Sequence, residues 1–147
     1  MSIRSMSVLF VLILLGLAAC GGTSQSAPTP VGDTAYINTS AADTTYSSRG
    51  NATKGKVLFT PCGSCHTTTT ERLVGPGLAG LFSDDGPILP NGVDYNGKLP
   101  NGKERTESNI ADWIRTGGQG QIGYMNSHTF DDQQMADLMA YLRTLKP

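Results

Sequence analysis

The sequence contains little net charge, few sulfur or imidazole side chains and no long hydrophobic run. Charged residues make up 16% of the 147 residues, and 11 basic residues against 12 acidic ones give a formal net charge of -1. This balance argues against a nucleic-acid-binding protein. No apolar run approaches the roughly 20 residues that cross a bilayer as a helix, which argues against a membrane-spanning protein. With only 3 cysteines and 2 histidines, the positions of these residues carry most of the functional information.

Residues 1–19 have the pattern of an export signal peptide. Arg4 precedes an apolar run over residues 8–17, a length typical of the core of such a signal. The run ends in Leu17-Ala18-Ala19-Cys20, which resembles the lipobox of bacterial lipoproteins. The resemblance implies cleavage before Cys20, lipidation of its thiol and export to the outer face of the cytoplasmic membrane or the periplasmic side. An ordinary secretory signal with an incidental cysteine is the alternative.

Residues 20–49 are predicted to form a lipidated, flexible tether. The stretch is rich in Ser, Thr, Gly, Ala and Pro, and it buries too little apolar surface to offset the entropy of ordering. Its few large apolar side chains, Tyr36, Ile37 and Tyr46, are either incidental or docking points on a partner subunit. A single folded domain is predicted over residues 50–147.

The motif Cys62-Gly63-Ser64-Cys65-His66 is the strongest chemical signal in the chain. The pattern C-x-x-C-H is typical of c-type haem attachment. Two thiols on one helical turn can each add to a vinyl group of the same porphyrin, and His66 then becomes the proximal iron ligand. A thioredoxin-like site would need a preceding strand, whereas a helical pattern precedes this motif. A structural zinc site would need a further ligand, and only the distant His128 is available.

Residues 50–147 resemble a small monohaem class I c-type cytochrome. Residues 55–59 are similar to the N-terminal helix of that family, and residues 73–82 to the segment that follows its haem motif. The resemblance implies an all-α, cytochrome c-like bundle of about four short helices around one covalently attached haem c. It also implies that the carbonyl of Pro76 accepts the proton on the far nitrogen of His66, which fixes the ring plane.

Two more helices are predicted after the motif. The C-terminal one is expected to start at an N-cap, Thr129, and to end with Arg143 and Lys146 in its last turn. Its apolar stripe consists of Met135, Leu138, Met139, Leu142 and Leu145. Leu138 and Tyr141 match the family positions that cross Gly55 and Phe59. The other helix is predicted near residues 106–116, with Ile110, Trp113 and Ile114 on its buried face and Gly117 as its C-terminal cap.

Four residues are candidates for the sixth iron ligand: Met125, His128, Met135 and Met139. The last two belong to the apolar stripe, which favours core packing. Met125 lies in a glycine-rich loop that can approach a flat ring closely, and its position matches the methionine ligand of the family. His128 is the rival ligand. Trp113 is a candidate donor to a haem propionate, with plain core packing as the alternative.

Residues 84–103 contain three Asn-Gly pairs and predict a small β-hairpin insertion, or two tight turns, over one haem edge. The segment could shield a propionate, form a docking surface or be a solvated loop.

The functional prediction is one-electron transfer, not enzyme catalysis. The protein would be a membrane-tethered carrier, or a subunit of a larger respiratory or photosynthetic membrane complex, with redox proteins as partners. Two alternatives remain open at this point. One is a haem enzyme or gas-binding sensor with an open sixth iron position, and the other is a zinc-binding lipoprotein.

Overall fold

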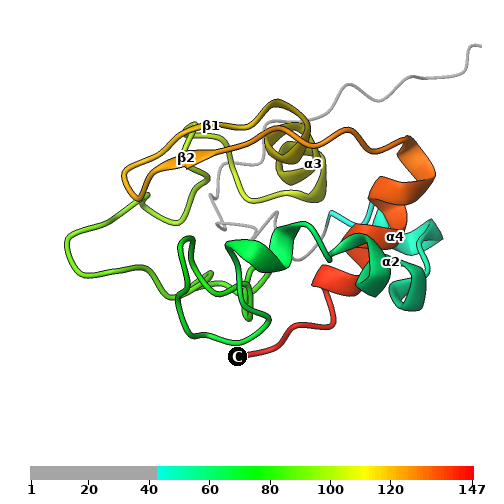
Figure 1. The fold of residues 1–147 in the computed structure, drawn as a ribbon, viewed down its shortest axis with the longest axis horizontal. Coiled ribbons are helices and arrows are strands. Elements are labelled where there is room, and N and C mark those ends of the chain that lie inside the picture. The colour runs from blue at the N-terminus through cyan, green and yellow to red at the C-terminus, as the bar shows by residue number, and fades with distance from the viewer. Residues whose placement is uncertain (1–42) are drawn as a thin grey trace, which may run out of the picture. The chain divides into compact units, whose positions relative to one another are not determined.

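The computed structural model describes residues 43–147, which fold into short helices and one small hairpin (Figure 1). In chain order the elements are the 3-10 turn η1 (Ser47–Arg49), α2 (Ala52–Leu58), the 3-10 turn η2 (Cys62–Ser64), α3 (Glu107–Thr116), β1 (Gly118–Gln119), β2 (Tyr124–Met125) and α4 (Asp132–Leu142). The strands pair antiparallel, with Gly118 opposite Met125. The predicted fold class, all-α with a small β-hairpin, is confirmed.

Part of the predicted organisation lies outside the described residues. This applies to the signal peptide over 1–19, to the lipidation site Cys20 and to the tether as far as residue 42. Within residues 43–147, no helix combines the length and the apolar character that crossing a bilayer requires.

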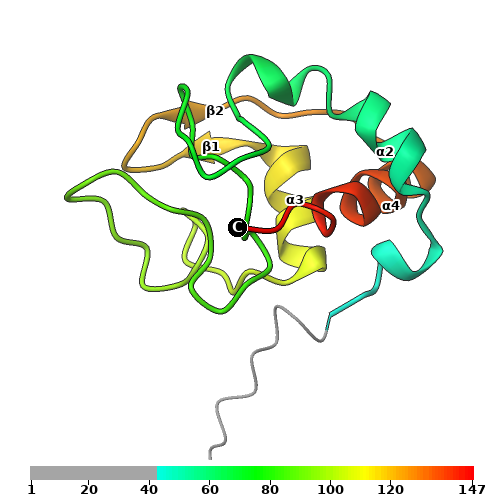
Figure 2. The same cartoon turned by 90° about the horizontal axis from the view of Figure 1, so that it is seen from below.

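Helices α2 and α4 cross in close contact at Gly55, as predicted (Figure 2). A Cβ atom at Gly55 would lie 1.9 Å from the carbonyl oxygen of Asp137 and 2.8 Å from Cβ of Tyr141, so only glycine fits. One turn later, the buried ring of Phe59 packs edge-on against the ring of Tyr141, with 5.6 Å between the centroids. The crossing therefore fixes where α2 ends and where the cysteine motif begins.

The start of α2 is also attached to α4. The side chain of Asn51 accepts the Lys54 N–H at 3.1 Å and so caps α2. The N–H of Asn51 donates to the Asp137 carboxylate at 2.7 Å, and this bond holds the pKa of Asp137 below its ordinary value. Gly50 permits the approach, because a Cβ there would lie 2.0 Å from the carbonyl oxygen of Ala136. Neither Gly50 nor Asp137 stood out in the sequence.

Helix α4 begins two residues later than predicted. The N-cap is Asp131, not Thr129, and its carboxylate accepts the Gln134 N–H while the Gln134 side chain accepts the Asp131 N–H. This reciprocal pair satisfies two donors at once, which explains why Asp131 is the better cap. Four members of the predicted apolar stripe, Met135, Leu138, Met139 and Leu142, are confirmed as buried core. The fifth, Leu145, lies beyond the end of α4 and is half-buried.

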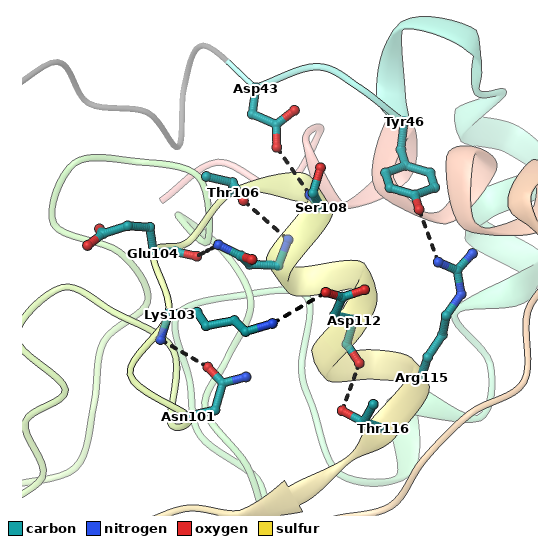
Figure 3. Close-up of polar contacts among 11 residues, drawn as sticks. Asp43, Tyr46, Asn101, Lys103, Glu104, Thr106, Ser108, Asp112, Arg115 and Thr116 are labelled. Atoms are coloured by element: carbon teal, nitrogen blue, oxygen red, sulfur yellow. Dashed lines mark hydrogen bonds and ion pairs between the residues drawn. The ribbon is translucent and has the colours of Figure 1, made fainter.

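Helix α3 agrees with its prediction at both ends. Thr106 caps it by accepting the Asn109 N–H (Figure 3). At the other end Gly117, at φ 62°, donates its N–H to the Trp113 carbonyl. Ile110 and Ile114 are buried on the predicted face, and Trp113 is half-buried. On the outer face, Lys103 pairs with Asp112 at 3.4 Å (Figure 3).

A buried carboxylate joins three distant parts of the chain. Glu107 is fully buried, and one of its oxygens accepts the N–H groups of Tyr46 and Ser47, each at 2.8 Å. Its other oxygen accepts a hydrogen bond from the Arg143 guanidinium. Arg143 and Lys146 were predicted in the last turn of α4, but the helix ends at Leu142, so Arg143 is its C-cap residue and Lys146 lies beyond it. The Arg143 side chain instead forms this ion pair.

Residues 43–49 were predicted to belong to the flexible tether, but they contact α3. The Asp43 carboxylate accepts the Ser108 N–H at 3.1 Å, and the Tyr46 hydroxyl accepts a hydrogen bond from Arg115 at 3.0 Å (Figure 3). The low hydrophobicity of the segment gave no sign of this docking, because most of the contacts are polar bonds to Glu107, Ser108 and Arg115, and Tyr46 alone packs against the core. The contacts with α3 therefore begin before residue 50.

Residues 84–103 form tight turns, the second of the two forms expected for this segment. Left-handed backbone occurs at Gly92, Asn96, Gly97 and Gly102, as Asn-Gly turns require. The only bridge recorded for this part of the described chain joins Lys98 and Glu104. The named strands lie instead at 118–125, so the hairpin is placed differently from the prediction. Asn-Gly pairs specify turns, but the flanking residues here do not alternate to extend a ladder.

We predict that Glu107→Gln lowers the free energy of unfolding by roughly 3 kcal/mol, because it removes the charge of a fully buried carboxylate that forms an ion pair with the Arg143 guanidinium. Glu104→Gln is the matched control, because the Glu104–Lys98 pair is exposed and contributes less than about 1 kcal/mol. Denaturant unfolding of the two purified variants checks this. Equal losses in both would show that the buried carboxylate has no special role.

Candidate functional site

The cysteine motif forms one tight turn directly after α2. Both the Cys65 and His66 N–H groups donate to the Cys62 carbonyl, at 3.1 and 2.9 Å. The Phe59 carbonyl in turn accepts the Cys62 N–H at 2.9 Å, which joins the turn to the end of α2. Pro61 is the N-cap of η2, consistent with its predicted place in a turn. Two thiols and an imidazole are thereby gathered within a single turn.

This turn lines a cavity of about 380 Å³. Met125 and His128 also line it, and the lining is mainly apolar. Among the apolar lining residues are Leu78, Leu81, Leu99, Ile110, Ile114, Leu138 and Leu142. The cavity lies within the size range of ligand and cofactor sites. All of the residues predicted to bind or ligate a cofactor border this one cavity. They are Cys62, Cys65, His66, Pro76, Trp113 and Met125.

The His66 ring is held in one orientation. Its Nδ1 lies 2.8 Å from the carbonyl oxygen of Pro76. Because a carbonyl can only accept, Nδ1 must carry the proton, and the lone pair of Nε2 is left for a metal. Gly75 packs against the same ring, since a Cβ there would lie 2.4 Å from His66 Cε1. The Gly75 N–H donates to the Cys65 carbonyl at 2.8 Å, which fixes this segment along the motif.

The two motif cysteines differ in environment and are not joined in a disulfide. Cys65 is exposed and Cys62 is half-buried. Burial raises the pKa of the Cys62 thiol. The element before the cysteines is α2 and not a strand, so the context of a thioredoxin-like site is missing. Among residues 43–147, no group of three or more His, Cys, Asp or Glu side chains is placed to hold a metal ion.

Met125 and His128, the two rival ligands, both border the cavity. Met125 is half-buried on β2, directly opposite Gly118 on β1. The His128 ring stacks on the Phe130 ring, with 6.2 Å between the centroids. His128 therefore also has a packing role. Met135 and Met139 are fully buried in the core and do not border the cavity, which confirms their predicted packing role.

Trp113 borders the cavity and also supports the hairpin. A Cβ at Gly118 would lie 2.8 Å from the indole ring, so the backbone of β1 rests on Trp113. This contact matches the core-packing interpretation, and the expected bond to a propionate stays a prediction.

Arg105 is a buried cation in the cavity wall that the sequence gave no reason to select. Its guanidinium donates to four backbone carbonyls, those of Gly97 at 2.6 Å, Leu81 at 2.7 Å, Asp84 at 2.8 Å and Ser83 at 3.0 Å. Burial lowers the pKa of Arg105. A lone arginine before a helix has no distinguishing pattern, because its partners are main-chain groups. In the structure it joins the loop at 81–84 to the turn at residue 97.

Comparisons with known proteins agree with this geometry. The family model for cytochrome c matches residues 52–146. A solved structure of cytochrome c2 from Rhodospirillum Centenum has a TM-score of 0.50 and 22% sequence identity, and the match covers 67% of this chain and 100% of that chain. This likeness concerns the fold. The curated proteins gave no match.

Proposed function

This chain belongs to the cytochrome c family of electron-transfer proteins, and on that premise we propose that it carries single electrons at the outer face of a membrane. Membership implies one covalently bound haem c and redox proteins as partners, and it places the protein among electron carriers, not enzymes. Beyond family membership, we propose which residues hold the haem, and we propose that the chain is anchored to the membrane through Cys20. The carrier acts alone or as a subunit of a larger respiratory or photosynthetic complex.

The assignment of the haem-binding residues rests on one observation. The imidazole of His66 has a fixed orientation, and the thiols of Cys62 and Cys65 belong to the same turn. The proton on Nδ1 of His66 is committed to the Pro76 carbonyl, so Nε2 is a lone-pair donor toward the cavity. Cys62 and Cys65 border the same space and would each form one thioether. When bound, haem c supplies an iron that changes oxidation state by one electron. The residues present fit this group.

Met125 is the proposed sixth ligand. It faces the cavity from β2, whereas His128 is already stacked on Phe130. A histidine–methionine pair keeps the iron six-coordinate in both oxidation states, so electron transfer needs little rearrangement. The thioether also raises the reduction potential.

The lining also supports a cofactor with carboxylates. Arg105 is a buried cation in the wall, and Lys98 borders the same cavity. The propionates of haem would gain from either positive charge, since buried anions need a partner. Near the motif, Leu73 and Val74 are 53% and 62% exposed, which supports apolar docking of a redox partner at this edge.

We predict that Met125→His lowers the reduction potential by on the order of 100 mV, well within the span of about 0.8 V that axial ligands cover. The red absorption band of a thioether–ferric iron bond should disappear as well. Met139→Leu is the matched control. Met139 lies in the buried core, so this substitution should leave the reduction potential and the absorption band unchanged. Redox titration with optical spectra provides the measurement. An unaltered potential and spectrum in Met125→His would remove Met125 from the site.

We predict that Cys20→Ser moves the protein from the membrane fraction to the soluble exported fraction, because the lipid-bearing thiol is lost. Thr23→Ser, three residues further on, is the control and should stay with the membrane. Fractionation and mass spectrometry of the mature N-terminus test this. An unmodified Cys20 in the wild-type protein would refute the anchor while leaving the haem assignment intact.

A further inference from the structure

The hairpin that carries Met125 contains little that could hold it rigid by itself. Its strands are two residues each, and Gly117, Gly118, Gly120 and Gly123 lie in or beside it. Glycine loses more conformational freedom on ordering than other residues. At its base the hairpin is tied to α3, through the Gly117 N–H on the Trp113 carbonyl and the His128 N–H on the Ile114 carbonyl, each at 2.8 Å. The tip needs a separate support.

That support comes from the turn at residues 94–97. The Tyr95 hydroxyl oxygen accepts the Gln121 N–H at 2.8 Å and the Ile122 N–H at 3.4 Å. The Gln121 side chain also donates to the Asp94 carbonyl at 2.7 Å and accepts the Asp94 N–H at 3.4 Å. These four hydrogen bonds are the only ones recorded within residues 43–147 between the tip, 120–122, and the chain outside the hairpin.

The backbone on both sides, in the turn at 94–97 and in the hairpin, allows this contact. Asn96 and Gly97 have φ values of 52° and 73°, so the Asn-Gly pair turns the chain sharply just after Tyr95. On the hairpin, a Cβ at Gly120 would lie 2.7 Å from the Tyr95 hydroxyl oxygen and 3.0 Å from Cβ of Pro100. The lack of a side chain at Gly120 therefore lets the tip lie this close. The Asn-Gly segment is therefore a support for the hairpin, and Tyr95 is its contact group.

We propose that Tyr95 is a positioning residue that holds the β1–β2 tip and thereby keeps the Met125 side chain at the sixth iron position. This inference rests on the proposed function, since it takes Met125 as the ligand. Met125 lies three residues beyond Ile122, and both border the cavity. Release of the tip would leave Met125 attached only through the base of the hairpin, and the sixth position would open more often.

The ferric holoprotein allows a direct test with imidazole, which competes with a thioether for iron. Apparent affinity for such a probe scales with the fraction of molecules in the open state. Tyr95→Phe keeps the ring and removes the hydroxyl oxygen. We expect its apparent dissociation constant for imidazole to fall about tenfold, which corresponds to about 1.4 kcal/mol. The thioether band should weaken, and hydrogen exchange at the Gln121 and Ile122 amides should speed up.

Tyr141→Phe is the matched control. It removes the same atom from a ring that packs on Phe59 in the α2–α4 contact, away from the hairpin. Its imidazole affinity should equal that of the wild type. Gln121→Ala removes the side-chain hydrogen bonds to the Asp94 backbone. It should change the imidazole affinity in the same direction as Tyr95→Phe.

An imidazole affinity of Tyr95→Phe within twofold of wild type would overturn the proposal, even if its melting temperature falls, because the tyrosine would then support only the fold. The two proposals can fail separately. A wild-type protein without the thioether band refutes Met125 as ligand, and the role of Tyr95 with it. A normal band in the wild type and unchanged binding in Tyr95→Phe refutes the role of Tyr95 alone.

Discussion

The close crossing of α2 and α4 at Gly55 is the constraint on which the rest of the structure depends. With the backbones in contact, Phe59 packs on Tyr141, and the carbonyl of Phe59 then begins the turn that holds both motif cysteines. The position of His66 follows from that turn, and the Pro76 carbonyl fixes its ring. The contact between the two helices and the Pro76 carbonyl therefore together determine the position and the orientation of the candidate metal ligand.

The opposite wall of the cavity is held by different means. It consists of a short hairpin on α3, and its support comes from the base at Gly117 and from the Tyr95 turn at the tip. Arg105 organises the long loop before α3 through its hydrogen bonds to backbone carbonyls. In the proposed site, His66 is therefore held by the motif turn and the Pro76 carbonyl, whereas Met125 depends on a hairpin held by a few hydrogen bonds.

The sequence was informative where the signal is local or periodic. The apolar stripe of α4 and the cap at Gly117 follow from spacing and residue type, and they agree with the structure except at Leu145. The close approach at Gly55 follows from the family resemblance and also agrees. The motif turn and its neighbour Pro76 follow from chemistry and family resemblance. What escaped were long-range polar contacts. Glu107, Arg105 and Tyr95 act through partners far along the chain, often backbone groups, and no pattern of residue types reveals such partners.

The central claim is that one haem is joined to Cys62 and Cys65 by thioether bonds. Intact-mass spectrometry after full denaturation tests it most directly, using protein made in cells that mature c-type cytochromes. The account predicts a single species of the mature chain plus one haem, which becomes a chain without haem when both cysteines are replaced by serine. A wild-type chain that loses all pigment on denaturation and has the mass of the polypeptide alone would contradict it.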